Sequence, residues 1–102
     1  MSASYNEYYK KQNYFGNPYP GLVKFFESYP NKTTVLDLGC GQGRDSLFLG
    51  RLGFEVTGVD ISSVGIKQLN EVAQSEGLKV KGIVDDIYTF DITDEYDIIL
   101  LD

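Results

Sequence analysis

The chain has 102 residues, a net charge of −6, one cysteine and no histidine. This composition is that of one globular domain, and it excludes a Cys/His metal site and a histidine-based catalytic triad. The acidic balance opposes binding to nucleic acid. The lack of an apolar run of about 18 residues or of a basic-then-apolar leader predicts a cytoplasmic protein that does not contact a membrane.

Residues 1–32 are expected to form a helical N-terminal segment. Tyr5, Tyr8 and Tyr9 are spaced as on one side of a short helix. Pro20 suits the first turn of a second helix, which should end near Pro30. The apolar residues of this second helix recur at helical spacing and predict a buried stripe of Leu22, Phe25, Phe26 and Tyr29.

Residues 33–102 alternate between strand and helix patterns. Strands are expected at 33–38, 55–60, 79–84 and 96–101. Helices are expected at 44–52, ended by Gly53, and from Ser62 or Ser63 to residue 76, ended by Gly77. The alternation predicts an α/β fold, a three-layer α/β/α sandwich around a parallel sheet with right-handed crossovers. We expect residues 1–102 to form a single domain.

The last predicted strand, YDIILL at 96–101, is the most apolar of the four. Nothing after it in the chain could cover its outer edge, and unpaired strand edges recruit other chains. We therefore expect the chain to be a fragment of a longer protein and to form a homo-oligomer through residues 96–101.

Three glycines in five residues follow the first predicted strand, in the sequence VLDLGCGQGRD at 35–45. Such a turn lets the backbone approach a ligand at the N-terminus of the next helix. The spacing G-x-G-x-G, followed by Arg44, differs from the dinucleotide pattern G-x-G-x-x-G, and no Gly-Lys-Ser/Thr follows to form a P-loop. Asp37 precedes the turn and suits an ammonium group, or else caps the adjacent helix.

Further acids end the second and third predicted strands. Asp60 stands where folds of this kind have an acid that accepts hydrogen bonds from ribose hydroxyls, although it could instead cap the following helix. The pair Asp85-Asp86 reaches the same edge of the sheet, next to Ile87. A nucleoside with a cationic tail would match these acids, and S-adenosylmethionine has that shape.

These stretches resemble the class I S-adenosylmethionine-dependent methyltransferases. VLDLGCGQGRD is similar to the first motif of that family, VTGVDIS at 56–62 to the second, VDDIYTF at 84–90 to the third, and YDIILLD at 96–102 to the fourth strand. Residues 39–62 are most similar to the tellurite-resistance-type branch. The resemblance implies a Rossmann-like doubly wound sheet of seven strands, of which this chain supplies four in the order 3-2-1-4.

The resemblance also implies a cofactor and a substrate class. S-adenosylmethionine would be the cofactor, S-adenosylhomocysteine the product, and a small molecule the methyl acceptor. Cys40 could instead be a small packing residue, and Arg44 is as consistent with a surface ion pair as with a substrate contact. The residues expected to contact the cofactor are Asp37, Gly39, Cys40, Gly41, Gly43, Asp60, Ile61, Asp86 and Ile87.

No catalytic residue is predicted, because methyl transfer needs no protein nucleophile. No metal ligand is predicted, because the chain has no histidine and a single cysteine. Tyr14, Tyr19 and Asp102 are the nearest candidates for shaping a substrate pocket. Two other interpretations remain open at this point. The chain could be a nucleotide-binding α/β module that does no chemistry, or an interaction protein that uses the glycine loop only as a turn.

Overall fold

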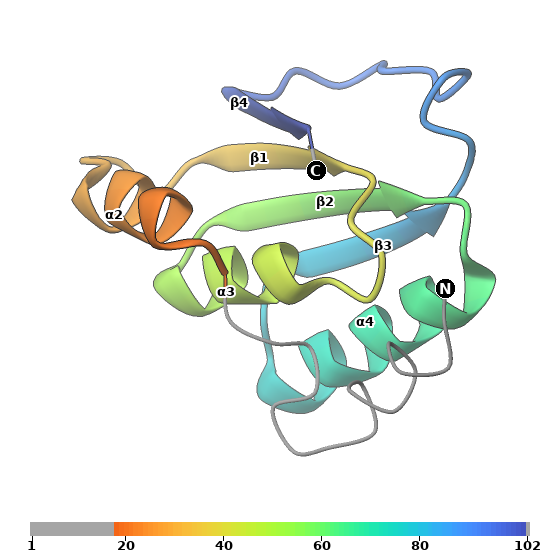
Figure 1. Cartoon of the computed structure of the whole chain (residues 1–102), viewed down its shortest axis with the longest axis horizontal. Coiled ribbons are helices and arrows are strands. Elements are labelled where there is room, and N and C mark those ends of the chain that lie inside the picture. Colours follow the sequence, from red (N-terminus) through yellow and green to blue (C-terminus); the bar gives the residue numbers. More distant parts are fainter. Residues whose placement is uncertain (1–17, 102) are drawn as a thin grey trace.

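The computed structural model describes residues 18–101, which form a four-stranded parallel sheet with helices packed on it (Figure 1). The elements are α2 (Pro20–Ser28), β1 (Thr34–Leu38), α3 (Arg44–Leu52), β2 (Glu55–Asp60), α4 (Ser63–Glu76), β3 (Val80–Val84) and β4 (Ile98–Leu101). The strand order is β3-β2-β1-β4, as expected. Every element expected between residues 18 and 101 is confirmed; the predicted helix at Tyr5–Tyr9 lies outside the described residues.

The register of the sheet brings the carboxyl ends of the strands to one edge. Leu38 of β1 pairs with Val59 of β2 and with Leu101 of β4, and Asp60 pairs with Val84 of β3. The chain passes from β1 to β2 on one side and later adds β4 on the other. Ligands of open α/β sheets bind at such a reversal of strand order, outside the carboxyl ends.

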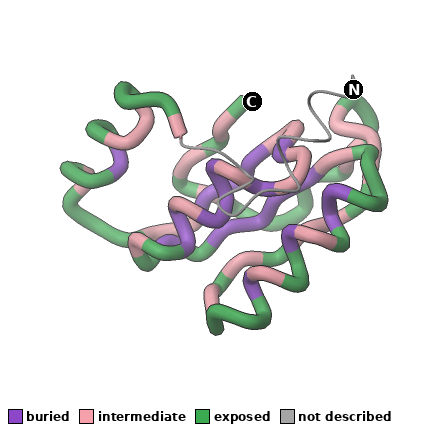
Figure 2. The backbone as a smooth tube through the Cα atoms, turned by 60° about the horizontal axis from the view of Figure 1, so that its bottom comes forward, coloured by how far each residue is buried: buried purple, intermediate pink, exposed green. Residues whose placement is uncertain are grey.

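The helices within residues 18–101 all pack on one face of the sheet. Contacts join α3 and α4 to β2 and β3, and Phe26 of α2 enters the same apolar cluster as Val35, Leu49 and Phe54. The buried residues concentrate in the central strands and on the sides of α3 and α4 that face them (Figure 2). The described residues thus supply the sheet and one helical layer of the predicted sandwich.

In α2, the predicted burial of Phe26 is confirmed and the predicted burial of Phe25 is wrong. Phe26 is 2% exposed and packs edge-on against Phe54, with ring centroids 5.3 Å apart. Phe25 is 53% exposed, because α2 meets the core along a narrow strip and no element covers its flank within the described residues. Its ring instead lies edge-on against that of Phe26, at 5.0 Å.

The ends of α3 and α4 follow the sequence signals. Gly53 and Gly77 end the helices in left-handed backbone conformations, as predicted. Ser62 caps α4, its Oγ accepting a hydrogen bond from the backbone N–H of Gly65 at 3.0 Å. At the other end of the two helices, the guanidinium of Arg51 donates to Glu76 and lowers the pKa of that exposed carboxyl.

The outer strand β4 leaves apolar side chains exposed. Within residues 18–101 it pairs with β1 alone, and Ile99 and Leu101 are 52% and 76% exposed. Association through residues 96–101 stays a prediction. None of the helices described here has the length and apolar character needed to cross a membrane.

Candidate functional site

The glycine loop connects β1 to α3 at the carboxyl edge of the sheet. Gly39, Gly41 and Gly43 have φ values of 83°, 58° and 92°, a left-handed backbone that residues with a Cβ rarely adopt. The N–H groups of Gly39 and Cys40 donate to the carbonyl of Val59 at 2.7 and 3.1 Å, which ties the loop to the end of β2. A Cβ on Gly43 would also collide with Leu69 of α4. The glycines therefore let the loop lie directly on its neighbours.

Asp60, the last residue of β2, joins the glycine loop to α4. Its Oδ1 accepts a hydrogen bond from the backbone N–H of Gly41 at 3.1 Å, and its Oδ2 accepts one from the N–H of Ser62 at 2.9 Å. An ionised carboxylate has about four acceptor positions, so these two bonds leave capacity for further donors. Asp60 thus fixes the loop and still presents acceptors at the sheet edge.

A cavity of about 280 Å³ lies at this edge. The sequence predicted five of the residues around it, Asp86 rather than Asp85 among them. The sequence analysis missed Tyr88, although it stands two residues after Asp86. Its N–H donates to Asp86 Oδ1 at 2.9 Å, within the turn that follows β3. The cavity is lined by Gly39, Asp60, Ile61, Asp86, Ile87 and Tyr88.

Four predicted residues do not line the cavity, and three of them, Asp37, Cys40 and Gly43, are buried. Asp37 is fully buried and its Oδ2 accepts a hydrogen bond from Ser46 Oγ at 2.6 Å. The side chain of Cys40 belongs to an apolar cluster with Leu47 and Leu69, so it packs as a small core residue. Gly41 and Gly43 shape the loop. Contact with a cofactor stays a prediction for all nine residues, including the five that line the cavity.

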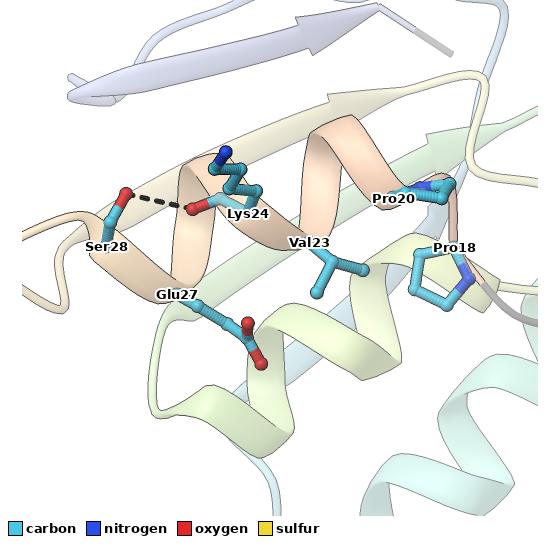
Figure 3. Close-up of a pocket in the computed structure, with 6 residues that line it drawn as sticks. All are labelled: Pro18, Pro20, Val23, Lys24, Glu27 and Ser28. Atoms are coloured by element: carbon cyan, nitrogen blue, oxygen red, sulfur yellow. Dashed lines mark hydrogen bonds between the residues drawn. The ribbon is translucent and has the colours of Figure 1, made fainter.

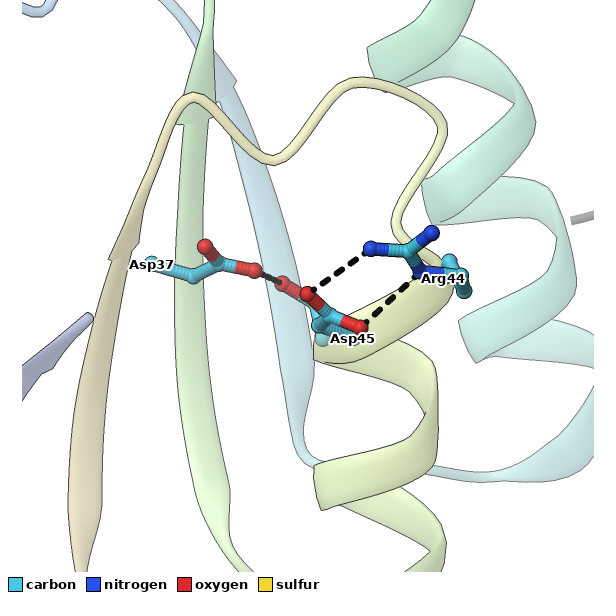
Figure 4. Close-up of polar contacts among 4 residues, drawn as sticks. Asp37, Arg44 and Asp45 are labelled. Atoms are coloured by element: carbon cyan, nitrogen blue, oxygen red, sulfur yellow. Dashed lines mark hydrogen bonds and ion pairs between the residues drawn. The ribbon is translucent and has the colours of Figure 1, made fainter. Parts of the chain in front are cut away.

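Arg44 begins α3 and makes an ion pair with its neighbour. Its Nε lies 3.0 Å from Oδ1 of Asp45, a carboxyl that is almost completely buried (Figure 4). The guanidinium carbon is 4.9 Å from the ring centroid of Tyr19, close enough for a cation–π contact. The geometry thus confirms an ion pair of Arg44, and a substrate contact of this residue stays a prediction. Tyr14 and Asp102 lie outside the described residues.

A larger hollow of about 480 Å³ runs along α2, away from the strand ends (Figure 3). None of the residues predicted to bind a cofactor lines this hollow. The hydroxyl of Ser28, one of its lining residues, donates to the carbonyl of Lys24 in the same helix. Its lining consists of Pro18, Pro20, Val23, Lys24, Glu27 and Ser28. The smaller cavity, where the loop, the acids and the strand ends meet, is the candidate site.

Comparison with known proteins identifies the family of this chain. Residues 3–102 match the family model described as "Tellurite resistance protein TehB". The chain is 39% identical over 98 residues to the probable S-adenosyl-L-methionine-dependent methyltransferase TehB of Haemophilus influenzae (strain 10810), a match that covers 91% of this chain and 34% of that protein.

Solved structures show the same fold. The crystal structure of TehB from Haemophilus influenzae matches with a TM-score of 0.78 at 35% identity, covering 87% of this chain and 33% of that one. A TehB-like SAM-dependent methyltransferase from Corynebacterium glutamicum matches with a TM-score of 0.73 at 25% identity, covering 97% of this chain and 53% of that one. The chain spans about a third of the length of the Haemophilus relatives.

Proposed function

The chain belongs to the TehB family, and on that premise we propose that it forms the S-adenosylmethionine-binding part of a methyltransferase. The observation that carries this proposal is the cavity at the carboxyl edge of the sheet, where the glycine loop meets Asp60 and Asp86. The position is the one at which open α/β sheets bind nucleotides.

The residues around the cavity fit the parts of S-adenosylmethionine. Asp60 keeps acceptor capacity for ribose hydroxyls beyond its two backbone bonds. Ile61 and Tyr88 are 73% and 91% exposed and, with Ile87, offer apolar and aromatic surface for a purine. Gly39 brings bare backbone to the same cavity, near the expected methionine end. These features support the cofactor over a ligand recognised by its phosphates.

The cofactor, when bound, supplies an activated methyl carbon. The residues of this chain would bind and orient the cofactor. Holding two reactants in line can lower an activation barrier by on the order of 7 to 11 kcal/mol. No side chain of this chain is assigned a catalytic role, because the acceptor itself is the nucleophile in a methyl transfer.

We infer a small molecule as the methyl acceptor. The net charge of −6 supports this choice over RNA, because nucleic-acid binding relies on basic side chains that neutralise phosphates. A cytoplasmic location remains the expectation from the sequence. Methyl transfer to RNA by the purified protein, with no small molecule methylated, would contradict this assignment of the acceptor.

Calorimetric titration of the purified protein tests the cofactor. We expect binding of S-adenosylmethionine and of S-adenosylhomocysteine, and no binding of NAD, because the loop lacks the third glycine of a dinucleotide site. Binding of NAD alone would favour a nucleotide-binding module of another class. Failure to bind any of the three ligands would favour an interaction protein.

Tyr88 provides a second test of the same site. Stacking of a base on an aromatic side chain contributes about 1 to 3 kcal/mol, and the low end applies to a ring as exposed as this one. We expect Tyr88→Ala to weaken S-adenosylmethionine binding about fivefold. Tyr88→Phe keeps the ring and should bind as the unchanged protein does; equal losses in the two variants would contradict a stacking role.

A further inference from the structure

The side chain of Asn70 in α4 is bonded to the backbone of β3. Its Oδ1 accepts a hydrogen bond from the N–H of Gly82 at 2.7 Å, and its Nδ2 donates one to the carbonyl of Gly82 at 3.2 Å. The amide therefore meets both backbone groups of one residue, as a residue of an antiparallel partner strand would. Figure 1 shows α4 lying beside β3, which is an end strand of the sheet.

The backbone directions in β3 show that this bond lies on the side of the strand away from β2. The carbonyl of Lys79 accepts a hydrogen bond from β2 at 2.8 Å, and the N–H of Asp85 donates one to β2 at 3.0 Å. Backbone groups of successive residues in a strand point to alternate sides, so the even-numbered residues between them point outward. Gly82 is the middle one of these outward residues, which are 80, 82 and 84. Within residues 18–101 no strand pairs with this side.

The packing of α4 leaves no room for a side chain at position 82. A Cβ built on Gly82 would lie 2.9 Å from Leu69 Cδ2 and 3.1 Å from Ile66 Cγ2, atoms of two buried side chains of α4. It would also lie 3.2 Å from Asn70 Oδ1. A larger residue would therefore displace α4 from β3 and weaken the bonds of Asn70. The glycine of the strand lets the asparagine of the helix reach the backbone.

The asparagine at position 70 is explained by this bond and not by the helix. The residue is exposed and lies within α4, where asparagine is a weaker helix former than alanine, glutamate or lysine. Unpaired strand edges recruit other chains, and native proteins commonly block them. With its middle outward residue already bonded, β3 offers a new strand a single outward residue on each side. A continuous ladder therefore cannot form along this edge.

We propose that Asn70 closes the free edge of β3 to a second copy of this chain. Two copies related by a two-fold axis would set their β3 strands antiparallel, with Gly82 opposite Gly82 at the centre. Such a pair exchanges both N–H···O bonds of Gly82, and these are the groups that Asn70 occupies. β3 continues into Asp85 and Asp86, and Asp86 lines the cavity, so the closed edge also keeps a second chain away from the rim of the candidate site. The inference does not depend on which ligand that site binds.

The variant Asn70→Ala tests the inference by opening the edge. Sedimentation velocity of the purified protein over a series of concentrations measures association, and amide hydrogen exchange locates it. In dilute solution we expect the Gly82 amide to exchange about fivefold faster in the variant, because its acceptor is removed. In concentrated solution we expect the variant to have about twice the weight-average mass of the unchanged protein, with slowed exchange at residues 80, 82 and 84.

The matched control is Gln74→Ala. Gln74 is an exposed amide one turn after Asn70 in α4, and its side chain makes no hydrogen bond within residues 18–101. Alanine favours the helix at both positions, so both variants should fold. Gln74→Ala should match the unchanged protein in both measurements. An Asn70→Ala variant that associates no more than the unchanged protein, or whose added association slows exchange at residues 98–101 and not in β3, would overturn the inference.

Discussion

Replacement of Asp60 by alanine is expected to weaken S-adenosylmethionine binding by about 10- to 150-fold. The carboxylate has two tasks in one place. It accepts backbone N–H groups from Gly41 and Ser62, which holds the glycine loop against α4, and its remaining acceptor positions suit the ribose hydroxyls. Hydrogen bonds to charged groups contribute about 1.5 to 3 kcal/mol, which corresponds to the stated loss. Calorimetric titration of the variant measures it.

A second acid of the same charge provides the control for Asp60. Asp94 is exposed in the loop between β3 and β4, outside the cavity. Asp94→Ala changes the net charge as Asp60→Ala does and should leave the affinity unaltered. Asp60→Asn keeps the shape of the side chain and one acceptor oxygen, so its affinity should fall between those of the unchanged protein and Asp60→Ala. Equal affinity in Asp60→Ala and the unchanged protein would rule out a ribose contact.

The elements of this fold could be predicted because their signals are local. Gly53 and Gly77 end α3 and α4, because each helix stops at a residue with a left-handed backbone conformation. Ser62 caps α4 through a hydrogen bond from Gly65, three residues away. The placement of Asp60 beside the loop could be predicted as well. Parallel strands bring their carboxyl ends to one edge, so the fold class alone puts Asp60 near Gly39.

The features that could not be predicted from the sequence depend on packing between segments that are distant in the chain. The position of Asp37 at the end of β1 predicts contact with a ligand, but only the packing of α3 against the sheet shows that its carboxylate is buried against Ser46. The exposure of Phe25 depends on how narrow the contact of α2 with the core is. The place of Tyr88 at the cavity depends on a turn around Asp86, whose geometry no periodic pattern encodes.

Replacement of Gly65 by alanine is expected to weaken cofactor binding at least about tenfold while changing the free energy of unfolding by less than about 1 kcal/mol. A Cβ at this position would lie 2.9 Å from the carbonyl oxygen and 3.1 Å from the carbonyl carbon of Gly41, both backbone atoms. The loop must therefore move, and the bond from Gly41 N–H to Asp60 is disturbed with it. Alanine stabilises a helix by up to about 1 kcal/mol relative to glycine, and this gain offsets the loss of folding free energy caused by the crowding. It does not restore the position of the loop.

The same substitution in α2 separates loop displacement from helix propensity. Gly21, like Gly65, stands in the first turn of its helix, but a Cβ there meets nothing within 4 Å. Gly21→Ala should therefore raise the free energy of unfolding by about 0.5 to 1 kcal/mol and leave cofactor affinity unchanged. Chemical denaturation and calorimetric titration of both variants give the comparison. If Gly65→Ala binds S-adenosylmethionine as tightly as Gly21→Ala does, the position of the Gly41 carbonyl does not affect ligand binding, and the glycine loop is not part of the binding site.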